Sequence, residues 1–164
     1  DAAEERNAMS LAFNAAEIFT MAEQIERDGA EFYRAAAGRL DDASARELLL
    51  EFAAMEDDHL RTFSAMKAEL TKAEARGTTF DPQGEAGLYL EALAGTRVFF
   101  HKDIDTSGLE GILKAAVGAE KDSILFYVGM KDLVAESLGR GRVEEIIREE
   151  MRHIRILGEK LASL

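Results

Sequence analysis

Apolar residues recur every three or four positions along four stretches of the chain, the spacing that places them on one face of an α-helix. The first stretch covers residues 14–40, and the second follows a turn at 41–44 and extends to residue 76. The third begins near 107 and extends to 138, and the fourth covers 143–161. The pattern therefore predicts an all-α protein with four long helices.

Two glycines and the single proline interrupt the helical pattern between the second and third helices. Within this connection, residues 77–106, only the segment 88–93 looks helical. A connection of this length allows one helical hairpin, 14–76, to pack against a second, 107–162, as a four-helix bundle. We expect residues 1–164 to form a single domain.

Composition narrows the range of partners. The chain has a net charge of −12, which disfavours nucleic acid and anionic membranes, and it has no apolar stretch long enough to span a membrane. Cysteine is absent, so neither disulfides nor cysteine-based metal sites can form. We expect a cytoplasmic protein whose carboxylates are mostly solvated, with the remainder available to bind cations.

An internal repeat carries the candidate chemistry. The stretch "IERDGAEFY" at 25–33 resembles "AEKDSILFY" at 119–127, 94 residues later, and the same offset relates two Glu-x-x-His motifs. Chance would seldom place both motifs at the same distance from matched Glu and Tyr residues. The matched residues are Glu26, Tyr33, Glu56 and His59 in the first half and Glu120, Tyr127, Glu150 and His153 in the second.

The four matched glutamates occupy helix positions that should face the core. Glu56, for example, shares a helix face with Phe52 and Phe63, which lie four residues before it and seven after it. Burying ionised carboxylates without partners would oppose folding by many kcal/mol. These glutamates must therefore be paired, protonated or bound to metal.

Two divalent cations would neutralise four carboxylates, and two neutral imidazoles would complete the ligand set. Pairing with basic side chains stays open, because Lys114, Lys121 and Arg155 are near in sequence, although such residues are scarce on these faces. Iron and manganese suit mixed His and carboxylate ligands, and zinc binds them without redox chemistry. The sequence thus indicates a dinuclear metal site.

Other polar residues have plainer interpretations. Tyr33 and Tyr127 either pack in the core or donate a hydrogen bond to a ligand carboxylate on a neighbouring helix. Asp28 and Asp122 repeat but lie on a different helix face, where we expect solvated or ion-paired carboxylates. His101 belongs to no carboxylate motif and is interpreted as a structural or surface residue.

The paired Glu-x-x-His motifs resemble those of the ferritin-like di-iron carboxylate superfamily, and most closely its rubrerythrin branch, over residues 14–162. The resemblance implies a ferritin-like antiparallel four-helix bundle with a long crossover, and a site for two iron ions with Mn or Zn as possible substitutes. By that resemblance Glu56 and Glu150 bridge both metals. The full implied ligand set is Glu26, Glu56, His59, Glu120, Glu150 and His153.

Two features depart from the rubrerythrin pattern. Rubrerythrins carry a rubredoxin-type iron centre on four cysteines, and this chain has none. They also carry an extra glutamate one turn after the glutamate of the third helix, where this chain has Ser123, with Gly29 at the matching position of the first half. A peroxidase-specific exchange of ligands is therefore in doubt.

The resemblance implies a redox enzyme that reduces hydrogen peroxide or dioxygen with electrons from an external donor protein. Two other functions remain open from the sequence. The site could oxidise and hand on iron, as a ferroxidase does, or the metals could only stabilise a non-catalytic helical bundle. The family also suggests a homodimer. We expect no nucleic-acid partner and no membrane partner.

Overall fold

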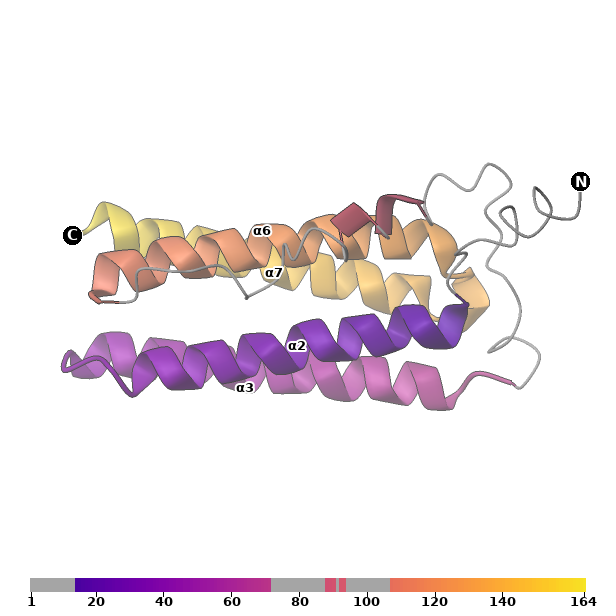
Figure 1. Ribbon diagram of the computed structural model, residues 1–164, viewed down its shortest axis with the longest axis horizontal. Coiled ribbons are helices and arrows are strands. Elements are labelled where there is room, and N and C mark those ends of the chain that lie inside the picture. Colours follow the sequence, from indigo (N-terminus) through magenta and orange to yellow (C-terminus); the bar gives the residue numbers. More distant parts are fainter. Residues whose placement is uncertain (1–13, 72–87, 91, 94–106) are drawn as a thin grey trace, which may run out of the picture.

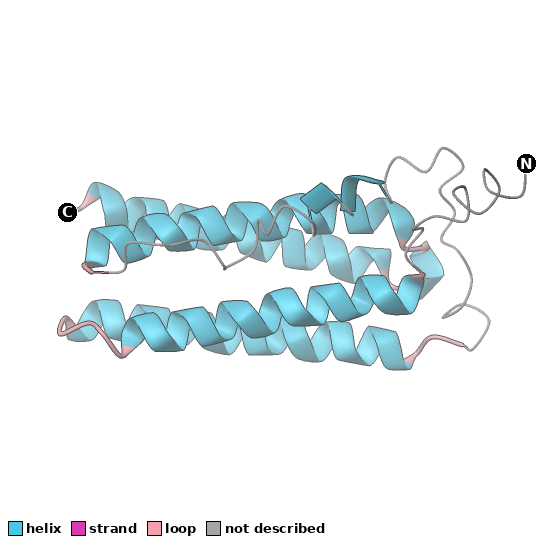
Figure 2. Cartoon of the chain, in the orientation of Figure 1, coloured by secondary structure: helices cyan, strands magenta, loops and turns pink. Residues whose placement is uncertain are grey.

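The computed structural model describes residues 14–71, 88–90, 92–93 and 107–164 (Figure 1). No strand occurs in these residues (Figure 2), as the all-α prediction requires. The long helices and one short 3-10 helix are α2 (Ala15–Ala37), α3 (Ala43–Ala68), α6 (Leu109–Leu133), η1 (Glu136–Leu138) and α7 (Arg140–Ala162).

The four long helices form an antiparallel bundle of two hairpins. Helix α2 pairs with α3 and α6 pairs with α7, and the hairpins meet through α2 with α6 and through α3 with α7 (Figure 1). Helix backbones approach one another more closely within a hairpin than between hairpins. Helix α3 ends at one end of the bundle and α6 begins at the other, so the topology is the one that the long crossover predicts.

Local side chains explain where the first two helices begin. Asn14 accepts a hydrogen bond from the Glu17 backbone amide at 2.9 Å, and Glu17 accepts one from the Asn14 amide at 3.1 Å, which is a capping box. At the start of α3, Asp42 accepts from the amide of Ala45 at 2.7 Å. Both caps satisfy amides that have no partner within the helix.

The structure corrects several predicted helix ends. Helix α2 ends at Ala37 rather than 40, and α3 ends at Ala68 rather than 76. Helix α6 ends at Leu133 rather than 138, because Val134 adopts an extended backbone and a 3-10 turn follows. Helix α7 begins three residues before the predicted 143, since Gly139 takes the left-handed conformation (φ 97°) that ends the turn.

The predicted crossover, 77–106, is described only at 88–90 and 92–93, which are helical as expected. This segment packs on the second half of α6. Tyr89 donates its hydroxyl to the Leu125 carbonyl at 2.6 Å, and Leu90 is fully buried. A Cβ at Gly129 would lie 2.7 Å from the Tyr89 ring, so a larger residue there would have to displace the ring.

Among the residues that the structure describes, the apolar core is divided into two clusters at opposite ends of the bundle. One contains Phe19, Phe63 and Phe126, and the other contains Leu49 and Leu113. Buried polar side chains fill the interval between the clusters. None of the helices in the described part of the chain is long and apolar enough to cross a membrane.

Candidate metal centre

Six of the residues singled out in the sequence come together midway along the bundle. Helices α2 and α6 each supply one glutamate, and α3 and α7 each supply a glutamate and the histidine one turn later. Every one of these residues is buried, with at most 3% of the surface of the whole residue exposed. They are Glu26, Glu56, His59, Glu120, Glu150 and His153.

The six residues form two overlapping groups, each able to hold one metal ion. Glu26 and His59 belong to one group, and Glu120 and His153 belong to the other. Glu56 and Glu150 belong to both. Within each group one ligand atom per residue lies within 4.8 Å of all the others. This arrangement is geometrically that of a dinuclear centre with two shared carboxylates.

Several ligand atoms converge without hydrogen bonding to one another. His59 Nδ1 lies 2.8 Å from one oxygen of Glu150, and His153 Nδ1 lies 3.1 Å from the other oxygen of Glu150. Six of these buried atoms nevertheless have no hydrogen-bond partner among the described residues. They are the Nδ1 atoms of His59 and His153, both carboxylate oxygens of Glu150, Oε2 of Glu26 and Oε1 of Glu56. Buried polar atoms are rarely left unpaired. Cations at the two positions would satisfy them, so the residues fit a metal pair.

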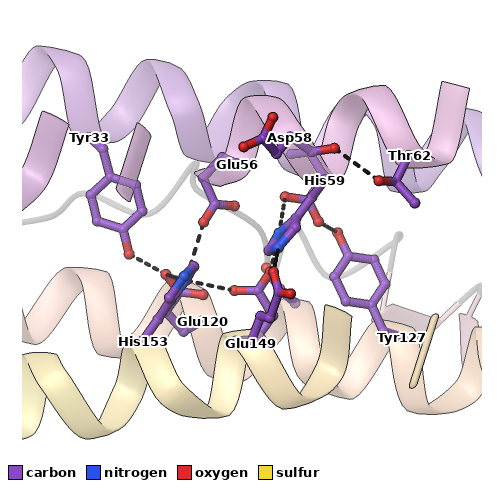
Figure 3. A network of polar contacts seen from close by, with 12 residues as sticks. Tyr33, Glu56, Asp58, His59, Thr62, Glu120, Tyr127, Glu149 and His153 are labelled. Atoms are coloured by element: carbon purple, nitrogen blue, oxygen red, sulfur yellow. Dashed lines mark hydrogen bonds and ion pairs between the residues drawn. The ribbon is translucent and has the colours of Figure 1, made fainter. Parts of the chain in front are cut away.

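The two tyrosines tie the hairpins together around the centre. The Tyr33 hydroxyl of α2 donates to Glu120 of α6 (Figure 3). The Tyr127 hydroxyl of α6 donates to Glu26 of α2. Both rings are buried. The tyrosines therefore also contribute to packing, and each phenol orients a candidate ligand carboxylate on the other hairpin.

Burial opposes ionisation of most of the glutamates. Loss of solvent raises the pKa of Glu56 well above its ordinary value, and the charge of Glu26 adds to the effect. Burial and then the charge of Glu150 raise the pKa of Glu120 to about 8. Burial also raises the pKa of Glu26 above its ordinary value. The pKa of Glu150 is instead lowered, because contacts with Glu120 and both histidines outweigh the effects of burial and of Glu56.

The histidines respond to the same cluster of charge. Burial by itself lowers the pKa of His59, but its contacts with Glu150 and Glu26 outweigh burial and raise the pKa to about 12. Contacts with Glu120, Glu150 and Glu56 likewise raise the pKa of His153 to about 12 against the effect of burial. Both shifts favour the protonated imidazoles, whose positive charge offsets part of the negative charge of the buried carboxylates.

Basic side chains do not neutralise the buried glutamates in the described part of the chain. Lys114 and Arg155 bind exposed glutamates of their own helices, at 2.6 Å and 2.7 Å respectively. Lys121 is exposed. These three basic residues therefore do not pair with the buried glutamates. Their absence from the cluster strengthens the interpretation that the glutamates bind metal.

Two other residues from the sequence analysis, Asp28 and Ser123, lie outside the two ligand groups. Asp28 accepts a hydrogen bond from Gln24 at 2.6 Å on the surface of α2. Ser123 is buried, and its hydroxyl donates to the Ala119 carbonyl of its own helix at 3.1 Å. That position therefore contributes no further carboxylate. His101 lies outside the described residues.

One contact of the centre was not predicted. Glu149 precedes Glu150 on α7, and its Oε2 atom lies 2.7 Å from Nε2 of His59 (Figure 3). Its side chain is 44% exposed, whereas that of His59 is 4% exposed. The repeat could not reveal Glu149, because the matching position of the first half is Met55. Only the rotation of α7 relative to α3 brings the two side chains together.

Comparison with known proteins agrees with this geometry. No family model matches the chain, and no curated protein sequence matches it. A similar solved structure is that of a protein from Thermotoga maritima described as a ferritin-like diiron-carboxylate protein, which is 25% identical. The match has a TM-score of 0.71 and covers 93% of this chain and 97% of that one. The chain therefore has a ferritin-like fold, and the similarity supports a place in the ferritin-like superfamily without indicating the rubrerythrin branch.

Proposed function

We propose that this chain binds two iron ions in the bundle centre and reduces hydrogen peroxide or dioxygen there. The observation that carries the proposal is the pair of overlapping ligand groups that share Glu56 and Glu150. The similarity to a ferritin-like diiron-carboxylate protein favours iron over the other metals that these ligands bind. On this proposal the protein acts as a rubrerythrin-like homodimer in the cytoplasm and serves in oxidative stress.

Two ferrous ions would supply the two electrons that, with two protons, convert hydrogen peroxide into two water molecules. The chain's own residues set the conditions for that chemistry. The four buried glutamates balance the charge of two divalent cations, and the two Nδ1 atoms point into the cluster. Tyr33 and Tyr127 hold the outer carboxylates, Glu120 and Glu26, in position. The apolar clusters on either side limit the access of water.

The electrons for a second turnover come, on this proposal, from a separate donor protein. The sequence contains no cysteine, so the chain offers no thiolate-bound iron centre of its own to relay them. This feature separates the proposed activity from that of rubrerythrins that carry a rubredoxin-type domain. A small reductant can replace the donor in an assay.

The test is to load the metal-free protein with Fe(II) under anaerobic conditions, measure bound iron, and follow absorbance after adding peroxide or dioxygen. About two irons per chain and a rapid ferric oxo-bridge band with peroxide are expected from the ligand count. Repeated turnover with a reductant would support the peroxidase. Oxidation by dioxygen that releases Fe(III) and does not turn over would indicate a ferroxidase instead, and a chain without stoichiometric metal would overturn the proposal.

Two variants sharpen this test. Glu56→Ala removes one of the shared carboxylates and should abolish loading at both positions. His101→Ala is the matched control, because its histidine belongs to no ligand motif. Loss of iron in His101→Ala would show that the wrong histidines have been assigned.

A further inference from the structure

The two metal positions have matching ligands but different surroundings. His59 Nε2 has Glu149 as a partner at 2.7 Å, on the side of the ring away from the cluster. His153 Nε2 is buried and has no hydrogen-bond partner among the described residues. Instead, the His153 ring stacks on Phe52, with ring centroids 4.7 Å apart. Position 55, which corresponds to 149 by the repeat, holds methionine.

A carboxylate behind a ligand histidine has a defined physical effect. Because Glu149 accepts from Nε2–H, it holds the proton on that nitrogen and leaves the Nδ1 lone pair directed at the cluster. It also fixes the rotation of the ring and adds negative charge on the far side. Such partners typically change metal affinity by about 10- to 100-fold. On its Nε2 side, His153 has no such carboxylate among the described residues, and its ring stacks on Phe52.

We propose that the two metal positions differ in affinity, and that the one formed by Glu26 and His59 fills first because Glu149 positions the His59 ring. The inference rests on the proposed dinuclear site, but it concerns any divalent cation and does not depend on turnover. Glu149 acts through His59 and is a positioning residue, since it belongs to neither ligand group. The first cation would then hold the shared carboxylates in place for the second.

The experiment titrates the metal-free protein with Co(II), whose visible absorption reports its ligand geometry. The wild type should bind two equivalents in two steps that differ about 10- to 100-fold in affinity. Glu149→Met makes the two halves alike and should weaken the tighter step until the two merge. Met55→Glu instead places a glutamate at the matching position of both halves, and it should strengthen the weaker binding step.

Two further variants control for charge and for chemistry. Glu145→Met removes an equal charge from an exposed position one turn earlier on α7 and should leave both steps unchanged. Glu149→Gln keeps an oxygen that accepts from Nε2–H and should retain much of the tight step. A crystal of the wild type with one equivalent of Co(II) should show anomalous scattering at the Glu26–His59 position.

The outcomes separate this inference from the proposed function. Equal anomalous scattering at both positions, or at the Glu120–His153 position alone, would overturn the inference and leave the dinuclear site standing. An unchanged tight step in Glu149→Met would overturn it as well. A wild type that binds no Co(II) would instead remove the metal site, and the proposed function with it.

Discussion

The ends of the bundle and its middle are built on opposite principles. At the ends, side chains such as Phe19, Leu49 and Leu113 are buried against other apolar groups, which favours folding. In the middle, four glutamates and two histidines are equally buried, but several of their polar atoms have no hydrogen-bond partner among the described residues. The same degree of burial therefore stabilises one region and opposes folding in the other.

This difference teaches that stability and chemistry are assigned to different segments of the same helices. The apolar ends hold the bundle closed, which fixes the polar middle before any metal arrives. On the proposed function, cations would convert an unfavourable cluster of charges into coordinated ligands, and metal binding and folding would be coupled. The comparison can be tested by changing one region at a time.

The largest expected effect is that of metal on the middle. Each cation that binds the folded state alone adds about 4 kcal/mol to the free energy of unfolding at a free concentration 1,000 times its Kd. Two cations therefore add about 8 kcal/mol. Urea unfolding followed by circular dichroism, with metal and with a chelator, measures the difference. Equal stability in both conditions would contradict the coupling.

A change in the apolar ends should have the next largest effect and leave the centre intact. Leu49→Ala removes a fully buried side chain and should lower the free energy of unfolding by about 2–5 kcal/mol. Metal content should stay at about two ions per chain, as measured by elemental analysis. A loss of metal in this variant would mean that the ends and the middle are not separable.

A substitution in the polar middle should raise the free energy of unfolding of the metal-free protein, whereas one in the apolar ends lowers it. Glu56→Gln removes a carboxyl group whose ionisation is opposed by burial and by Glu26, as its raised pKa indicates. We expect the metal-free variant to be more stable than the metal-free wild type by about 1–4 kcal/mol, while metal binding is lost. Urea unfolding of both proteins in chelator compares them, and a destabilised variant would refute the expectation.

The middle should also make the metal-free protein sensitive to pH. The pKa of Glu120 rises from 4.5 to about 8 on folding, so the folded state binds more protons than the unfolded state between these values. The pKa values of His59 and His153 rise from 6.5 to about 12 and act in the same direction. The free energy of unfolding should therefore fall as pH rises from 4.5 to 8.

Unfolding in urea across that pH range measures the slope. The variant Glu120→Gln should show a shallower decline, because it lacks one of the groups that release protons on unfolding. With metal bound the slope should disappear or reverse, because ligands must lose protons to coordinate. A metal-free protein that gains stability over this range would show that other groups dominate.

The smallest expected effect is at the boundary between the two regions. Tyr33→Phe keeps the aromatic packing and removes only the hydroxyl that donates to Glu120. We expect a loss of about 1 kcal/mol in the free energy of unfolding and two metals still bound. Thermal unfolding of the metal-bound protein detects this loss. If the two tyrosine contacts are equivalent, Tyr127→Phe should lower the free energy of unfolding by a similar amount.

The sequence was sufficient to find the fold and the cluster, because both leave periodic signals. The apolar spacing identifies each long helix, and the offset of 94 residues identifies the matched residues that the structure brings together. Which of them bind metal stays a prediction. The buried positions of Glu26 and Glu120 follow from helix periodicity alone, since each residue shares a face with apolar neighbours.

Other features depend on tertiary structure and left no such signal. The residues after Ala68 are good helix formers with no stop signal before Gly77, so α3 was predicted too long. The extended backbone at Val134 likewise has no local cause in the sequence. Glu149 was missed because its partner lies on another hairpin, and its contact depends on how two helices are rotated against each other.

The mismatch between Glu149 and Met55 also bears on the history of the chain. If the bundle were a symmetric dimer of two identical hairpins, both positions would carry the same residue, because every substitution in the gene would appear in both copies. A single polypeptide that contains both halves is free of this restriction. Tandem linkage thus allows one half to change while the other does not, and it would let two candidate metal positions with matching residues acquire separate tasks.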